Sequence, residues 1–118
     1  FCVFFVFQAE DDIRDLLLSR GLGYVYKSQY HMFFCYRYSA GYRGKEKGYR
    51  IGYAYSEDLT NWSRDDSKVG IDISTDGWDS EMISYPHVFE LDGNIYMFYL
   101  GNQVGRFGFG LARLSGNL

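Results

Sequence analysis

Residues 30–36 read YHMFFCY, and residues 49–55, which follow a polar, glycine-containing loop at 37–48, read YRIGYAY. The first segment is apolar or aromatic on both faces, which is typical of a strand that is covered on both sides. The second segment has a similar aromatic character and predicts the returning strand of an antiparallel hairpin. A turn at 56–62 closes this hairpin, and the charged residues at 63–68 predict a short edge strand.

A second hairpin of the same kind lies further along the chain. Residues 85–91 and 95–100 predict two strands joined by a tight turn with the sequence Asp92-Gly93-Asn94. Residues 107–114 predict the strand that returns beside them. The second half of the chain therefore repeats the pattern of the first half.

The two units align with each other residue by residue. Residues 32–34 (MFF) match residues 97–99 (MFY), and residues 51–54 (IGYA) match residues 109–112 (FGLA). A repeat of about 60 residues built from antiparallel strands is typical of the blades of a β-propeller. We therefore expect an all-β fold of about one and a half blades that belongs to a longer protein. Such a piece leaves a blade face and strand edges bare, so we also expect poor solubility.

The first 29 residues differ in character from the rest. Acidic side chains in the first turn, and Arg20 followed by glycine at the end, predict a helix over residues 9–20. Residues 5–29 resemble the translated sequencing-adapter read-through found at the ends of many metagenomic reading frames. This resemblance implies that residues 1–29 are an artefactual, disordered or helical leader and that the natural domain comprises residues 30–118.

Composition excludes several classes of protein. The chain has 118 residues, of which 47% are hydrophobic and 20% aromatic, and this composition excludes a disordered protein. A net charge of −3 argues against nucleic acid and anionic membranes as partners. The basic residues between 43 and 50 are interrupted by Glu46 and glycines, which predicts a solvated hairpin loop. Cys35 lies inside an apolar run and is interpreted as a small buried hydrophobic residue. Since only His31 and His87 are then available as ligands, a zinc site is not expected, nor is any other metal or cofactor. The start of the chain lacks the features of a signal peptide, so a cytoplasmic location is favoured.

The order of these motifs is similar to that in the five-bladed β-propeller glycoside hydrolases of families 43, 32 and 68 and their relatives. Residues 51–62 (IGYAYSEDLTNW) resemble the pattern that closes a blade, and residues 85–99 (YPHVFELDGNIYMFY) resemble the blade that follows. Residues 78–83 (WDSEMI), then Gly101-Asn102 and residues 108–112 (GFGLA), are similar to a group of uncharacterised bacterial members of this superfamily. The resemblance covers most of the chain after its first 29 residues.

The resemblance implies carboxylate catalysis on a glycosidic bond. One acid protonates the leaving oxygen, and a second carboxylate acts from the opposite face of the sugar. In this superfamily the acid is commonly a Glu just before a Pro at the start of a blade's first strand. Here Ser84 stands two residues before Pro86, and Glu81 lies three residues further upstream. We therefore expect Glu81 to be the acid, with Asp79 as a second carboxylate or as a group that tunes the acid's pKa.

The resemblance also implies contacts with carbohydrate. The expected substrate-binding residues are Trp78 as a stacking platform, Tyr85, His87, Arg37 and Asn102. Each of them also has a structural interpretation, such as packing or loop anchoring. The expected function is that of a glycoside hydrolase fragment acting on a poly- or oligosaccharide. A carbohydrate-binding propeller without catalysis, and a glycoside phosphorylase with a basic phosphate pocket, remain as alternatives.

Overall fold

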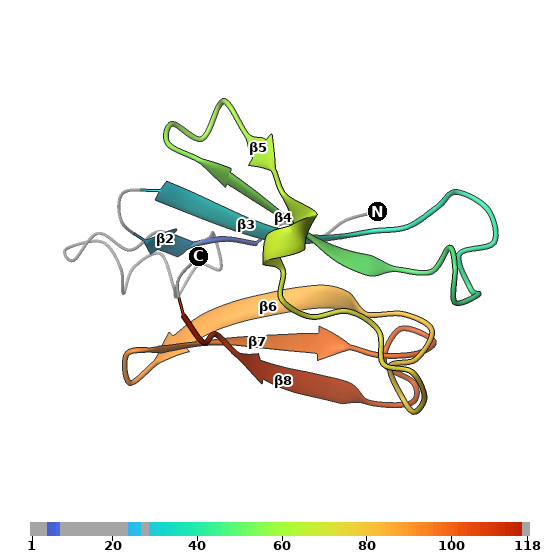
Figure 1. Ribbon diagram of the computed structural model, residues 1–118. Helices are drawn as coiled ribbons and strands as arrows, with labels where there is room; N and C mark the ends of the chain where they lie inside the picture. The colour runs from blue at the N-terminus through green and yellow to red at the C-terminus, as the bar shows by residue number, and fades with distance from the viewer. Residues whose placement is uncertain (1–4, 8–23, 27–28, 117–118) are drawn as a thin grey trace.

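A computed structural model describes residues 5–7, 24–26 and 29–116, and these residues form two antiparallel β-sheets (Figure 1). The first sheet has the strand order β1-β3-β4-β5, with β2 also paired to β3, and the second has the order β6-β7-β8. The strands are β1 (Phe5–Phe7), β2 (Tyr24–Tyr26), β3 (Gln29–Tyr36), β4 (Arg50–Ser56), β5 (Ser63–Arg64), β6 (Ser84–Leu91), β7 (Asn94–Leu100) and β8 (Phe109–Arg113). The predicted all-β class is confirmed. The helix predicted over residues 9–20 lies outside the described residues.

The edge strand predicted at 63–68 is only partly correct. Strand β5 has two residues, and a 3-10 helix, η1 (Asp66–Lys68), follows it. The side chain of Asp65 caps this helix by accepting a hydrogen bond from the backbone N–H of Ser67. Because Asp66 instead turns its carboxylate to the backbone N–H of Tyr53, the chain leaves the sheet edge after Arg64. Within the described residues, no helix is long and apolar enough to cross a membrane.

Strand register confirms the internal repeat. Phe34 pairs with Gly52 in the first sheet, and Tyr99 pairs with Gly110 at the matching place in the second. In both units the aromatic ring lies over the glycine. A Cβ atom at Gly52 would stand 2.5 Å from the ring of Phe34, and one at Gly110 would stand 2.5 Å from the ring of Tyr99. The two glycines therefore serve the same packing purpose, as the alignment predicted.

Replacing Gly52 with alanine is expected to lower the free energy of unfolding by about 2 kcal/mol, because the new methyl group overlaps the Phe34 ring and the Asp66 carboxylate. Urea unfolding measures this loss. Gly44→Ala is the matched control, because its nearest neighbour would be the Gly41 carbonyl oxygen at 3.6 Å. Equal stability of the two variants would contradict the close approach of ring and glycine.

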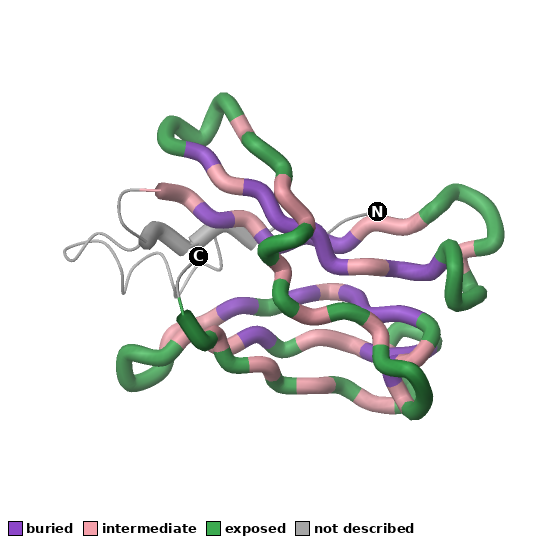
Figure 2. The backbone as a smooth tube through the Cα atoms, viewed as in Figure 1, coloured by how far each residue is buried: buried purple, intermediate pink, exposed green. Residues whose placement is uncertain are grey.

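The core lies between the two sheets, which face each other in Figure 1. Buried side chains from both sheets and from the segment before β6 meet there, and they are Phe33, Ile51, Tyr53, Ile83, Val88 and Met97. Figure 2 shows these buried stretches facing each other across the two sheets. Tyr53 is 1% exposed, and its hydroxyl lies 2.6 Å from Nδ1 of the buried His31. Apolar packing across the sheets thus holds the two repeat units together.

Burial of Tyr53, with smaller effects from Tyr55 and Asp65, raises the pKa of its phenol from 10.0 to about 12. The folded state therefore holds this proton more tightly than the unfolded state. The resulting stability is fully present below pH 10 and is lost as the pH rises toward 12. We expect urea unfolding to show a loss of about 2 kcal/mol across this window. Tyr53→Phe should remove that part of the pH dependence, and an unchanged alkaline slope in this variant would contradict the assignment.

In the first unit, one apolar face of the sheet packs in the core. The second unit has matching apolar residues on the corresponding face, but there they are exposed. By the repeat alignment, Phe33 corresponds to Phe98, Ile51 to Phe109 and Tyr53 to Leu111. These three positions in the second unit are 38%, 69% and 55% exposed, respectively. A large exposed apolar face promotes association.

The double variant Phe109→Thr/Leu111→Thr is therefore expected to raise the concentration at which the chain self-associates by roughly tenfold. Sedimentation velocity measures this change. Leu59→Asn is the control, at a 48% exposed position on the turn after β4 whose φ of 63° asparagine tolerates, and it should leave association unchanged. An equal effect of the control would show that this face has no special role.

Candidate functional site

Three loops meet at one end of the two sheets, on the right in Figure 1. They comprise residues 37–49, 74–83 and 101–108. The backbone N–H of Ile83 donates to the carbonyl of Tyr49 at 3.1 Å, and the N–H of Asn102 donates to the carbonyl of Trp78 at 2.7 Å. Six of the seven predicted site residues lie in or directly beside these loops, and the exception is His87.

Asn102 organises the central loop. Its Oδ1 accepts hydrogen bonds from the backbone N–H groups of Glu81 (2.8 Å) and Met82 (3.2 Å). Its Nδ2 donates to the carbonyl of Gly77 (3.1 Å) and to Oγ of Ser80 (3.3 Å). The side chain is 8% exposed, so each bond replaces one that water would otherwise make. The structure therefore places Asn102 as the anchor of the loop that carries Glu81.

Trp78 lies against glycines of the neighbouring strand and loop. A Cβ atom at Gly101 would stand 2.5 Å from its ring, and one at Gly110 would stand 2.7 Å from it. The indole also stacks on the ring of Tyr99, with centroids 5.6 Å apart. Trp78 is only partly buried and lines a cleft together with Glu81. Trp78 thus packs the loop and still offers an apolar surface at the cleft.

Asp79 is buried and faces the interior. Its carboxylate accepts a hydrogen bond from the hydroxyl of Tyr99. Burial, the negative charge of Asp79 and this hydrogen bond raise the pKa of the Tyr99 phenol, so the phenol remains a donor near neutral pH. Only 6% of the surface of Asp79 is exposed. The two carboxylates of the loop therefore occupy different environments.

Glu81 is exposed, and its backbone is held on both sides. Asn102 accepts from its N–H, and Nη1 of Arg50 donates to its carbonyl at 3.1 Å. Its carboxylate has no hydrogen-bond or ion-pair partner among the described residues. It lines an open cleft of about 460 Å³ together with Gly77, Trp78, Asn102, Gln103 and Phe107. A fixed backbone presenting an unpaired carboxylate is an arrangement suited to proton transfer.

Arg37 and Tyr85 are connected through Tyr49. Nε of Arg37 donates to the hydroxyl of Tyr49 at 3.0 Å. Tyr85 hydrogen-bonds the same hydroxyl, and this bond, followed by burial, raises the pKa of Tyr85. It adopts a left-handed φ of 51° at the irregularity where β6 begins, which turns its ring toward Tyr49 at a centroid distance of 5.9 Å.

His87 and Ser84 stand apart from this group. His87 is exposed, pairs with Phe98 in the sheet and stacks on Phe89 at 6.0 Å, so it lies on the outward face of the second sheet. Ser84, at the position where the family resemblance expects a Glu, is completely buried. The Oγ of Ser84 has no hydrogen-bond partner in the described part of the chain. A carboxylate at this position would be desolvated, whereas Glu81 is open to solvent.

Arg50 and Tyr49 contact the residues of the candidate site, and the sequence analysis did not identify them. Arg50 donates to the carbonyls of Tyr49, Lys45 and Glu81 and forms an ion pair with Asp72 at 3.2 Å. It thereby joins the loops and the connection between the units. Both residues lie at the start of a predicted strand, where nothing in the local pattern distinguishes a loop-bridging side chain from an ordinary strand residue.

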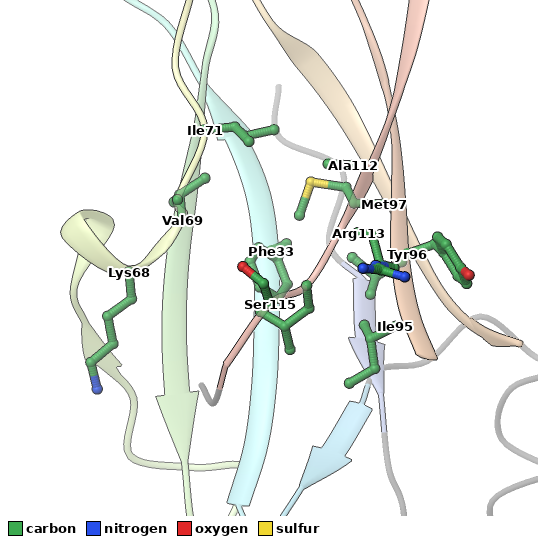
Figure 3. Close-up of a pocket in the computed structure, with 13 residues that line it drawn as sticks. Phe33, Lys68, Val69, Ile71, Ile95, Tyr96, Met97, Ala112, Arg113 and Ser115 are labelled. Carbon is green, nitrogen blue, oxygen red and sulfur yellow. The ribbon is translucent and has the colours of Figure 1, made fainter. Parts of the chain in front are cut away.

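A separate, apolar cleft of about 270 Å³ lies between the sheets (Figure 3). Phe33, Val69 and Ile71 line one side of it, and Ile95 and Met97 line the other. None of the predicted site residues lines it. Among the residues that the structure describes, no group of three or more His, Cys, Asp or Glu side chains is placed to hold a metal ion.

Comparisons with known proteins bear on the fold. No family model matches the chain. Two curated relatives from Mycobacterium tuberculosis, both described as uncharacterized proteins, are 46% identical over 86 residues. The match covers 73% of this chain and 26% of each relative, so the chain spans about a quarter of the length of the curated relatives it matches. A solved structure described as a glycoside hydrolase has 22% identity and a TM-score of 0.57, and the match covers 80% of this chain and 26% of that one. The chain thus shares the fold of part of a glycoside hydrolase structure.

Proposed function

We propose that this sequence is part of a glycoside hydrolase that cleaves glycosidic bonds in a poly- or oligosaccharide, with Glu81 as the general acid. The observation that carries the proposal is the presentation of Glu81. Its N–H is fixed by Asn102 and its carbonyl by Arg50, and Glu81 is exposed and lines an open cleft together with Trp78. An aromatic surface next to a carboxylate suits a sugar ring and its glycosidic oxygen.

The length of the mycobacterial relatives supports a propeller built from further units of the same kind. Since 86 matched residues make up 26% of each mycobacterial relative, each relative has about 330 residues. Five units of about 60 residues fit into that length. The exposed face of Phe98, Phe109 and Leu111 repeats the face that packs one unit on the next, which supports a following blade at this position.

The second carboxylate of the reaction comes from outside this sequence in our proposal. Asp79 is buried against Tyr99, so within these residues it is placed to hold the loop and to act on the cleft through its charge. The same observation favours the second candidate, a propeller that binds carbohydrate without cleaving it. In that case the Trp78 cleft binds sugar and Glu81 serves as a hydrogen-bond acceptor.

The experiment that tests the proposal measures binding and cleavage separately. The chain is applied to an array of polysaccharides, and one of the longer mycobacterial relatives is assayed for the release of reducing sugar ends. Binding together with release is the expected result. Binding without release would establish the carbohydrate-binding alternative. The absence of both would overturn the proposed function.

A further inference from the structure

A second cleft beside the Glu81 cleft has a different character. It has a volume of about 480 Å³ and lies between the loop at 37–49 and the loop at 101–108. Its lining consists of Arg37, Tyr42, Arg43, Tyr49, Met82, Gln103 and Val104. Gln103 also lines the Glu81 cleft, so the two clefts are neighbours. The lining of the second cleft includes two arginines and no carboxylate.

Arg37 is held in place without a carboxylate. Its Nε donates to the Tyr49 hydroxyl at 3.0 Å, its Nη1 donates to the carbonyl of Tyr38 at 3.0 Å, and its guanidinium lies 3.8 Å from the centroid of the Tyr42 ring. Arg43 approaches the same ring at 5.5 Å. Among the described residues, neither arginine forms an ion pair. An arginine fixed by aromatic and neutral partners keeps donors for an incoming anion.

Arg50 also connects loops, but unlike Arg37 it has a carboxylate partner. Arg50 forms an ion pair with Asp72 at 3.2 Å and donates to three carbonyls, so it serves the fold. Arg64, on the edge strand, is likewise paired with Asp66 at 2.6 Å. Arg37, although half-buried, has no such partner. Leaving a partly desolvated cation without a carboxylate is unfavourable unless another anion binds there.

The basic side chains of the loop at 37–50 add to the positive charge around this cleft. Residues 37–50 contain the basic side chains Arg37, Arg43, Lys45, Lys47 and Arg50 and a single acidic one, Glu46, although the whole chain carries a net charge of −3. A concave surface lined with one sign of charge concentrates ions of the other sign. The sequence alone predicted a solvated hairpin loop here. The structure leaves most of this loop exposed, as predicted, and also brings two of the five cations onto one tyrosine ring that lines the cleft.

We propose that the Arg37–Arg43 cleft binds an oxyanion, a carboxylate or phosphate group, carried by the glycan whose glycosidic bond lies at Glu81. The inference rests on the proposed function, since the adjoining cleft must receive the sugar. Tyr49 completes the site. Its hydroxyl oxygen accepts a hydrogen bond from Nε of Arg37 and so holds the guanidinium at the cleft that both residues line. The substrate class is therefore an acidic or phosphorylated saccharide.

The test compares a neutral sugar with two acidic derivatives of it and with a free anion. The chain, labelled for NMR, is titrated with glucose, glucuronate, glucose 6-phosphate and inorganic phosphate, with affinities expected in the millimolar range. We expect the acidic sugars to bind roughly tenfold more tightly than glucose and to shift the resonances of residues 37–49. Preference for glucuronate identifies a carboxylate source, and preference for glucose 6-phosphate identifies a phosphate source.

Substitutions in the loop at 37–49 test whether the acidic sugars bind in this cleft. Arg37→Ala is expected to abolish the preference for acidic sugars, and Arg43→Ala, at an exposed position that leaves folding intact, is expected to reduce it by roughly threefold. Lys45→Ala removes the same charge from the same loop outside the cleft lining and is the matched control. An equal effect of the control would overturn the site, since it would show a general charge effect.

The outcomes separate this inference from the proposed function. If glucose binds and the acidic sugars bind no better, the sugar cleft stands and the oxyanion site is wrong. If inorganic phosphate binds through Arg37 and no sugar binds, the oxyanion site stands as a site for the free anion, while the link to a glycan and the proposed function fall. If nothing shifts the resonances of residues 37–49, the oxyanion site is overturned.

Discussion

Replacing Glu81 with glutamine in a protein of full length that carries this sequence is expected to lower the cleavage of natural glycosidic bonds by about 1,000-fold. Glutamine keeps the size and polarity of the side chain but has no acidic proton to transfer to the leaving oxygen. Because the backbone of Glu81 is held by Asn102 and Arg50, the substitution should leave the loop in place. Affinity for the saccharide should therefore stay within about twofold of the original.

Kinetics with different leaving groups tests this role specifically. An aryl glycoside with a good leaving group needs little protonation, so Glu81→Gln should cleave it almost as fast as the unmodified protein does. Glu57→Gln, at an exposed carboxylate on the turn after β4, is the matched control and should change nothing. If Glu81→Gln slows aryl and natural substrates equally, Glu81 is not the acid. Unchanged cleavage of the natural substrate would contradict the assignment outright.

Replacing Asn102 with alanine is expected to have the largest effect on stability, a loss of about 3 kcal/mol in the free energy of unfolding. The substitution removes four hydrogen bonds and leaves the N–H groups of Glu81 and Met82 without their acceptor. These groups lie in a loop whose next residues are buried, so water replaces the lost partner poorly.

Urea unfolding measures the loss, and amide hydrogen exchange at Glu81 and Met82 locates it. Exchange at these two amides should accelerate more than exchange in β7, where the ladder with β6 and β8 is intact. Gln103→Ala changes the neighbouring exposed amide and should cost less than about 0.5 kcal/mol. A loss below about 1 kcal/mol for Asn102→Ala would show that the loop does not depend on this side chain.

The residues that hold the loops around the two clefts act in different ways. Asn102 and Arg50 fix the course of the loop at 77–83, while Tyr49 fixes Arg37. The first pair acts on backbone groups and leaves the Glu81 carboxylate exposed. The second contact orients a cation. Both arrangements place charged groups on a prearranged scaffold, which lowers the cost of ordering them when a ligand binds.

Strand positions and the repeat were predictable because they depend on local patterns. Alternating and continuous apolar segments define β3, β4, β6 and β7, and the turn at Asp92-Gly93, with φ values of 50° and 75°, follows directly from its residue types. The alignment put Phe34 and Tyr99, and Gly52 and Gly110, at matching positions, and the structure pairs Phe34 with Gly52 and Tyr99 with Gly110 through the same ring-over-glycine contact. The family resemblance added the expectation of a glycoside hydrolase fold, which the structural comparison supports for part of such a protein.

The sequence by itself therefore determined the all-β class, the two repeated units and the loop in which Glu81 stands. Tertiary structure decided what each polar side chain does, because that depends on partners far away in the chain. Asn102 reaches back over 21 residues to the N–H of Glu81, and Arg50 reaches forward over 31 residues to its carbonyl. Asp79 is buried against Tyr99, His87 lies on the outward face, and Arg37 is turned onto Tyr42 and Tyr49. A local pattern specifies whether a residue lies in a strand or a loop, but hydrogen-bond partners and burial follow only when the strands and loops pack together.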